Sequence, residues 1–119
     1  MKTVYVYGNS FVEEDAMALQ VGRTLKGVNI VHLTMPEQLF DLKEKKVTIL
    51  DVVANITDPL IIQDISQLDA PHLVSLHDFD LGFYLLLMQK MGINKHIKII
   101  GIPPTGDAQK IGKQVKTWI

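Results

Sequence analysis

The hydrophobic positions of this sequence fall into short continuous runs separated by segments of helical spacing. Residues 3–7, 28–33, 47–52 and 97–102 are nearly continuous apolar runs, which are typical of parallel strands covered on both faces. Residues 60–62 form a shorter run, and the connection ahead of it has no room for a crossover helix. We therefore expect this fifth strand to run antiparallel to its predecessor.

The segments between these runs predict four helices. The first stops ahead of Gly27, and the second, residues 36–42, has a proline in its first turn, where proline is tolerated. Residues 79–91 form the third helix, which is apolar around most of its circumference, so we expect it to be well buried. Asp107 is placed to cap the fourth. The helically spaced apolar sets are Met17, Ala18, Val21 and Leu25 in the first helix, and Ala108, Ile111, Val115 and Trp118 in the fourth.

The order of these elements is β-α-β-α-β-β-α-β-α. Strands that alternate with helices indicate an α/β fold, here a three-layer α/β/α sandwich around a mostly parallel five-stranded sheet. The sequence contains no internal repeat, low-complexity segment or linker. We therefore interpret residues 1–119 as a single domain.

Composition and charge exclude several classes of function. The chain is 47% hydrophobic and 21% charged, which is typical of a globular protein, and its net charge of -1 gives no electrostatic basis for binding nucleic acid. It has no cysteine, which excludes disulfides, cysteine-ligated zinc and a cysteine nucleophile. It shows neither a signal peptide nor a stretch able to span a bilayer, so we expect a cytoplasmic protein without membrane insertion.

Acidic residues follow the first predicted strand. Gly8 and Asn9 allow a tight turn there, and Glu13, Glu14 and Asp15 follow in the same loop. The carboxylates could serve a site at the sheet edge, or they could simply favour the first turn of a helix through its dipole. The loop has no Gly-x-Gly-x-x-Gly pattern, so it gives little support for a dinucleotide site.

Asp51 and His77 occupy comparable places further along the chain. Asp51 ends an apolar strand, where aspartate is depleted, and His77 comes just ahead of the helix at residues 79–91. Either residue could be a local cap. Because side chains that leave the carboxyl ends of parallel strands converge on one crevice, we expect Asp15, Asp51 and His77 to meet there, facing solvent and adding little to stability. Two carboxylates and an imidazole suit a divalent transition metal with open coordination positions.

The remaining histidines, His32, His72 and His96, lack acidic neighbours and are interpreted as structural.

The arrangement resembles the hydrogenase maturation endopeptidases. That family opens with a strand, a Gly-Asn pair and then an acidic pair that begins five residues after the Asn, which selects Glu14 and Asp15 here. The second acid of that pair, here Asp15, is the family's first metal ligand. The second metal ligand is an aspartate at the end of an apolar strand, as at Asp51, and the third is a histidine ahead of a long apolar helix, as at His77. A later strand that ends in Gly-x-x-Pro is matched within residues 99–104.

The resemblance implies an endopeptidase that removes the carboxyl-terminal extension of a nickel-iron hydrogenase large-subunit precursor. It implies that the enzyme senses nickel already inserted in that precursor, and that other divalent metals could substitute in vitro. The implied catalytic and metal-contacting residues are Asp15, Asp51 and His77, with Glu14 in reserve and with Gly8 and Asn9 positioning the loop.

Two other classes of function remain open. One is a non-catalytic α/β module that docks a hydrogenase subunit or another protein. The other is a flavodoxin-like phosphate binder, which is less favoured because the carboxylates of residues 13–15 would repel a phosphate.

Overall fold

The computed structural model describes residues 2–8, 13–63, 79, 81–93 and 95–119, with the backbone alone for residues 13–15. The described residues form one five-stranded sheet in which four strands are parallel and β4 runs antiparallel to its neighbour β5. The α/β prediction, including the antiparallel fifth strand, is confirmed. The strands are β1 (Lys2–Tyr7), β2 (Val28–Leu33), β3 (Lys46–Val52), β4 (Leu60–Ile62) and β5 (His96–Ile102), and their order in the sheet is β2-β1-β3-β5-β4.

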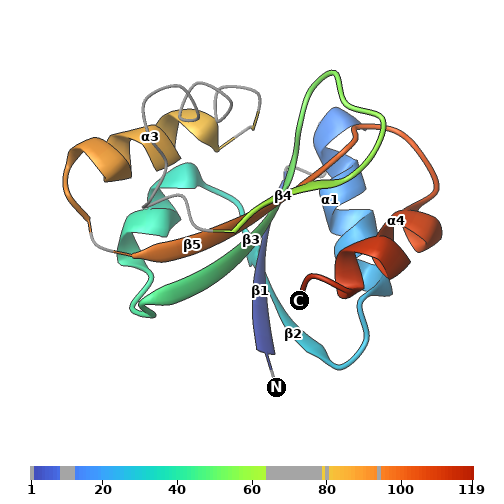
Figure 1. Cartoon of the computed structure of the whole chain (residues 1–119), viewed down its shortest axis with the longest axis horizontal. Helices are drawn as coiled ribbons and strands as arrows, with labels where there is room; N and C mark the ends of the chain where they lie inside the picture. The colour runs from blue at the N-terminus through green and yellow to red at the C-terminus, as the bar shows by residue number, and fades with distance from the viewer. Residues whose placement is uncertain (1, 9–12, 64–78, 80, 94) are drawn as a thin grey trace.

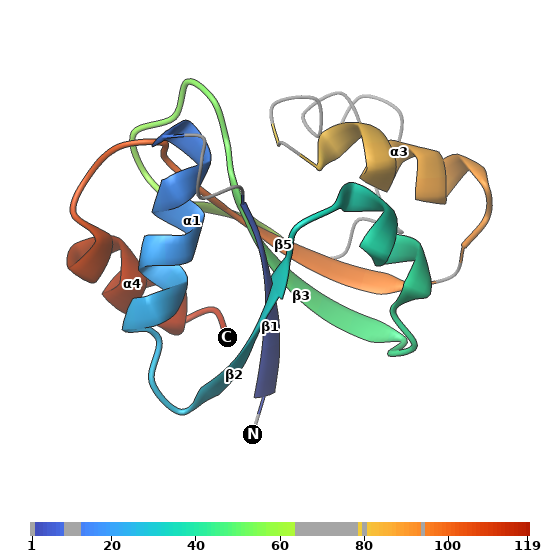
Figure 2. The same cartoon turned by 180° about the vertical axis from the view of Figure 1, so that it is seen from behind.

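Helices cover both faces of the sheet. Helices α1 (Glu13–Thr24) and α4 (Ala108–Lys116) lie together on one face, and η1 (Pro36–Asp41) and α3 (Gly82–Lys90) lie on the other. Figures 1 and 2 show the twisted sheet passing between these two helical layers. The segment after β2 forms a 3-10 helix, a tighter winding than the α-helix and one that is used in short pieces.

The two helical layers enclose separate apolar cores, which the alternation along β3 illustrates. Ile49 packs into the core under η1 and α3, whereas Leu50 and Val52 pack into the core under α1 and α4. Successive side chains of a strand point to opposite faces, so the continuous apolar run supplies both cores. Asp51, between Leu50 and Val52, is therefore on the η1 and α3 side.

Helix α3 is less buried than its apolar sequence predicts. Leu85 and Met88 are buried against the sheet, but Phe83 is 66% exposed and Met91 is 60% exposed. A single helix lying on a sheet can bury only one side against it, so the apolar residues on its other side face outward. No described helix has the length and apolar character needed to cross a membrane.

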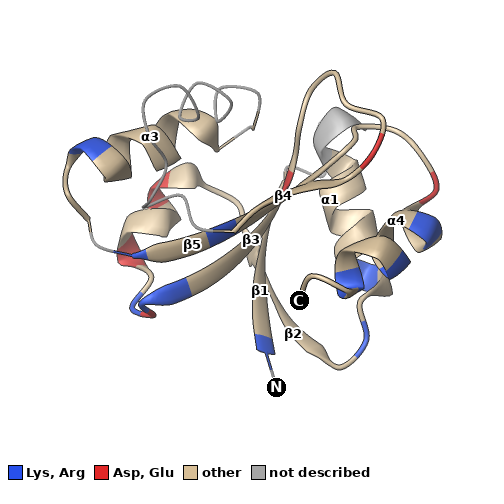
Figure 3. Ribbon diagram, in the orientation of Figure 1, with Lys and Arg blue, Asp and Glu red and all other residues tan. Residues whose placement is uncertain are grey.

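Helix α4 matches its sequence pattern closely. The Asp107 side chain accepts the N–H groups of Gln109 at 3.0 Å and Lys110 at 3.4 Å, which confirms the predicted cap. Ile111 and Val115 are buried against the sheet. The lysines of α4, coloured blue in Figure 3, lie on its exposed side, and they are Lys110, Lys113 and Lys116.

Candidate functional site

The strand order has a switch point at one place along the carboxyl edge of the sheet. From β1 the chain crosses to β2 on one side, whereas β3 adds on the other side of β1. The connections on the two sides carry α1 and η1, which cover opposite faces. Ligands of open α/β sheets bind at such a switch point, outside the carboxyl ends of the strands. The end of β1 and the end of β3 therefore flank the candidate site.

Asp51 lies at this point, on the central strand of the sheet. The pairing of β1 with β3 runs through Val6 with Leu50, and Asp51 follows directly. Its side chain is 0% exposed. The carboxylate accepts the N–H of Val52 at 2.9 Å through Oδ1 and the N–H of Leu81 at 2.9 Å through Oδ2. A buried charge on a central strand is rare unless it is paired or hydrogen-bonded, and these bonds satisfy that requirement.

Residues around Asp51 bring the start of α3 to the carboxyl edge. Val53 pairs with Phe79 in an isolated antiparallel bridge, and Asp51 is bonded to Leu81. On β5 the residue opposite Asp51 is Gly101, where an added Cβ would lie 2.4 Å from Cγ2 of Val53 and 2.8 Å from Cε1 of Phe79. Only glycine leaves room for Phe79 at this level of the sheet.

This environment differs from the expectation for Asp51 in one respect. We expected a carboxylate that faces solvent and adds little to stability, and instead the side chain is buried and holds backbone groups from two segments. The reason is that Asp51 points toward the face covered by α3, and the residue ahead of that helix, Leu81, is bonded to it. A carboxylate oxygen has two lone pairs, so accepting one N–H does not by itself prevent it from binding a cation.

Gly8, the residue after β1, lies on the other side of the switch point. The Gly8 carbonyl oxygen lies 2.7 Å from Nε2 of His32 on β2. We interpreted His32 from the sequence as structural, and no local motif marks it. Its contact depends on the register that pairs His32 with Val6, which only the assembled sheet supplies.

The remaining predicted site residues are described incompletely or not at all. The backbone of Glu14 and Asp15 lies in the first turn of α1, which follows β1 at the carboxyl edge. Asn9 and His77 lie outside the described residues. Within the described part of the chain, no three histidine, aspartate or glutamate side chains gather in a way that could hold a metal ion. Convergence of Asp15, Asp51 and His77 therefore stays a prediction.

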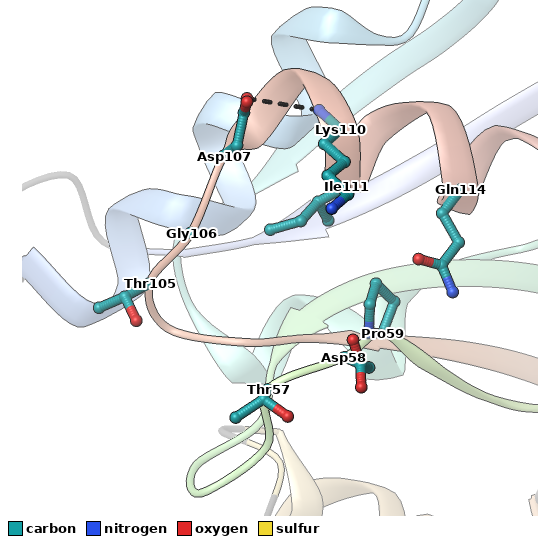
Figure 4. A pocket seen from close by; sticks show the side chains of 9 residues that line it. All are labelled: Thr57, Asp58, Pro59, Thr105, Gly106, Asp107, Lys110, Ile111 and Gln114. Atoms are coloured by element: carbon teal, nitrogen blue, oxygen red, sulfur yellow. Dashed lines mark hydrogen bonds between the residues drawn. The ribbon is translucent and has the colours of Figure 1, made fainter.

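A separate hollow of about 260 Å³ lies further along the same edge, between the segment ahead of β4 and the start of α4 (Figure 4). Asp58 and Asp107 both line it. The Asp107 carboxylate is already used as the cap of α4, as the dashed line to Lys110 shows. None of the residues that line this hollow belongs to β1 or β3, so it is distinct from the switch point between those strands.

Comparison with known proteins identifies the fold. No protein-family model matches the sequence, and a comparison with curated proteins finds no match. The solution structure of the endopeptidase HycI from Escherichia coli shares 18% identity with a TM-score of 0.56, over 99% of this chain and 91% of that one. The crystal structure of the nickel-iron hydrogenase maturation protease HycI from Thermococcus kodakarensis shares 17% identity with a TM-score of 0.53, over 98% of this chain and 90% of that one.

These two structures extend over almost the whole of this chain, and their own chains are covered almost completely. The α/β architecture that the order of elements in the sequence predicted agrees with this fold. This chain is thus an α/β protein with the fold of the hydrogenase maturation endopeptidases.

Proposed function

We propose that this protein is an endopeptidase that removes the carboxyl-terminal extension of a nickel-iron hydrogenase large-subunit precursor after sensing the nickel in it. The observation that carries the proposal is the buried Asp51 carboxylate at the switch point of the sheet. It supports an active site because ligands of open α/β sheets bind outside the strand ends at such a switch point.

Asp15 and His77 are proposed to join Asp51 around the substrate-borne metal, with Glu14 as the alternative in the acidic loop. Asp15 belongs to the first turn of α1, at the same edge as Asp51. His77 precedes Phe79 by two residues, and Phe79 is held beside the end of β3 by its bridge to Val53. Because only one residue separates His77 from Phe79 in the sequence, we propose that His77 lies near the end of β3.

In this proposal the nickel is part of the substrate. It would polarise the scissile carbonyl or activate water, which are the two ways a divalent ion assists hydrolysis. Specificity would arise because only a loaded precursor presents the ion and the scissile segment together.

The decisive experiment is incubation of the purified protein with a large-subunit precursor that does or does not carry nickel, followed by mass measurement of the product. We expect trimming of the nickel-loaded form alone. Equal trimming of the nickel-free form would contradict the sensing mechanism and leave the protease assignment in place.

A matched pair of variants locates the activity. Asp51→Asn keeps the shape of the side chain but removes its charge and one of the two oxygens that accept backbone N–H groups. It should abolish trimming, and the assay is run at a temperature where urea unfolding shows that the variant is folded. Asp58→Asn removes the charge of an exposed aspartate on the same edge, ahead of β4, and should leave trimming unchanged. Equal activity of the two variants would contradict a catalytic role for Asp51.

A second candidate function is a non-catalytic module that docks a hydrogenase subunit or another protein. The complete burial of Asp51 and its bonds to two backbone N–H groups favour it, because they give the carboxylate a structural role. Stable association with the precursor, with no change in its mass in either nickel state, would select this alternative.

A further inference from the structure

His32 makes a contact that extends the pairing of β1 and β2 beyond its last residues. The two strands pair from Lys2 with Val28 to Tyr7 with Leu33, and Gly8 is the first residue past the ladder. Nε2 of His32 lies 2.7 Å from the Gly8 carbonyl oxygen. A carbonyl oxygen only accepts hydrogen bonds, so Nε2 carries the proton and donates it. The imidazole therefore holds the chain at the point where strand pairing has ended.

The held residue begins the connection between β1 and α1, at the switch point of the sheet. The far end of that connection is held by the packing of α1, in which Met17 and Val21 are buried. At Gly22 an added Cβ would lie 3.1 Å from Cγ2 of Val6, so α1 approaches β1 closely. Gly8 and α1, which precede and follow that connection, are thus each held against the sheet, Gly8 by the His32 bond and α1 by its packing.

The surroundings of His32 leave the ring dependent on this bond. His32 is an exposed residue of an edge strand. Its ring borders a hollow of about 220 Å³ on the α1 side of the sheet. A ring beside open space is not held there by close packing, so the hydrogen bond to Gly8 is what orients it. The other residues that line this hollow are Val6, Leu19, Gly22, Arg23 and Ile30.

We propose that His32 is a positioning residue that fixes Gly8 at the end of β1 and thereby helps to place the first turn of α1 relative to Asp51. The functional part of this inference rests on the proposed peptidase activity. His32 acts through the Gly8 carbonyl, and it has no part in the cleavage chemistry itself. Loss of the bond should slow the chemical step by misplacing the acidic loop, with little effect on the affinity for the precursor.

The test uses two variants of His32 and one control. His32→Phe removes the donor and keeps a ring, whereas His32→Gln retains an N–H donor. Asn29→Ala removes a different side-chain bond between β1 and β2, in which Nδ2 of Asn29 donates to Oγ1 of Thr3 at 3.3 Å. Asn29 lies near the opposite end of the same strand pair.

With the nickel-loaded precursor as substrate, His32→Phe should lower kcat about three- to ten-fold with KM nearly unchanged, as expected for the loss of one hydrogen bond that matters in the transition state. His32→Gln should recover most of the rate, and Asn29→Ala should match the wild type. Equal kcat losses in His32→Phe and His32→Gln, or a loss confined to KM, would overturn the positioning role.

Two measurements test the contact without using activity. Long-range nitrogen–proton NMR on the wild type should show a protonated Nε2 on His32, and amide exchange near Gly8 and the first turn of α1 should be faster in His32→Phe than in Asn29→Ala. An unprotonated Nε2, or unchanged exchange in His32→Phe, would overturn the inference even if the protein cleaves nothing. If His32→Phe fails to fold, the Nε2 protonation of the wild type and the exchange rates of His32→Gln decide the question in the same way.

Discussion

The Asp51 carboxylate accepts the backbone N–H of Leu81 at 2.9 Å, and this bond joins the central strand to the start of α3 across 30 residues of sequence. The same side chain also accepts the N–H of Val52. Asp51 thus has a structural role in addition to the catalytic role proposed for it. Experiments that replace this residue must separate lost folding from lost chemistry.

Asp51→Ala is expected to destabilise the protein by about 2–5 kcal/mol, because a buried N–H that loses its acceptor costs about 1–3 kcal/mol and two are affected. Urea unfolding of the wild type and the variant measures this difference. A change below about 0.5 kcal/mol, the range of ordinary surface substitutions, would mean that the two bonds contribute little.

Gly101→Ala should disturb both stability and function. The new Cβ would lie 2.4 Å from Val53 and 2.8 Å from Phe79, so the segment at the start of α3 must shift. Overpacking of this kind costs about 1–3 kcal/mol. Gly92→Ala is the control, because no atom lies within 4 Å of its added Cβ and the strain comes only from its φ of +71°. Trimming activity at a temperature where both variants are folded should fall only in Gly101→Ala.

Two neighbouring leucines of α3 should differ sharply in their effect on stability. Leu85 is 0% exposed, whereas Leu86 is only partly buried at the margin of the same core. Leu85→Ala should cost about 2–5 kcal/mol through lost burial and the cavity left behind. Leu86→Ala should cost clearly less, although its sequence environment is just as apolar. Equal losses in thermal or chemical unfolding would contradict the observed packing of α3.

The Tyr5 hydroxyl donates to Oε2 of Glu44 at 2.5 Å, and this bond, with burial and the Glu44 charge, raises the pKa of Tyr5 to about 12 from 10.0. A raised pKa means that the folded state holds the proton more tightly than the unfolded state. The resulting stability is fully present below about pH 10 and is lost as the pH rises toward about 12.

NMR titration of the Tyr5 ring checks this pKa, and Glu44→Gln should bring it back toward about 10. Unfolding measurements should show the wild type losing stability relative to Tyr5→Phe only across this alkaline range. A difference that instead varies between pH 5 and 8 would assign the effect to another group.

The purified protein is expected to bind free nickel weakly. The three proposed ligands include no thiolate and form no closed four-ligand cage, so most of the affinity should come from contacts with a loaded precursor. Metal analysis after gel filtration should find little nickel, and an equimolar addition should leave Tm unchanged. A nickel complex that survives gel filtration and raises Tm would instead indicate a resident metal site.

The sequence alone predicts most of the architecture because the information is local. Continuous apolar runs such as residues 47–52 identify buried strands, and helical spacing identifies α4. A glycine with positive φ commonly ends a helix, and Gly92 does so directly after the C-cap residue of α3. Gly27 also has a positive φ, but it lies three residues past the end of α1. These signals operate within one turn or one strand, so they can be read without knowing the neighbours.

The sequence also marked Asp51 as unusual, because a carboxylate at the end of an apolar strand requires a partner. The sequence did not identify that partner, because Leu81 is 30 residues away and its N–H meets Asp51 only in the folded chain. For the same reason His32 gave no signal, and its bond to Gly8 exists only in the register of β1 with β2. The degree of burial of α3 was likewise decided in three dimensions, because an apolar sequence does not tell how much of a helix its neighbours will cover.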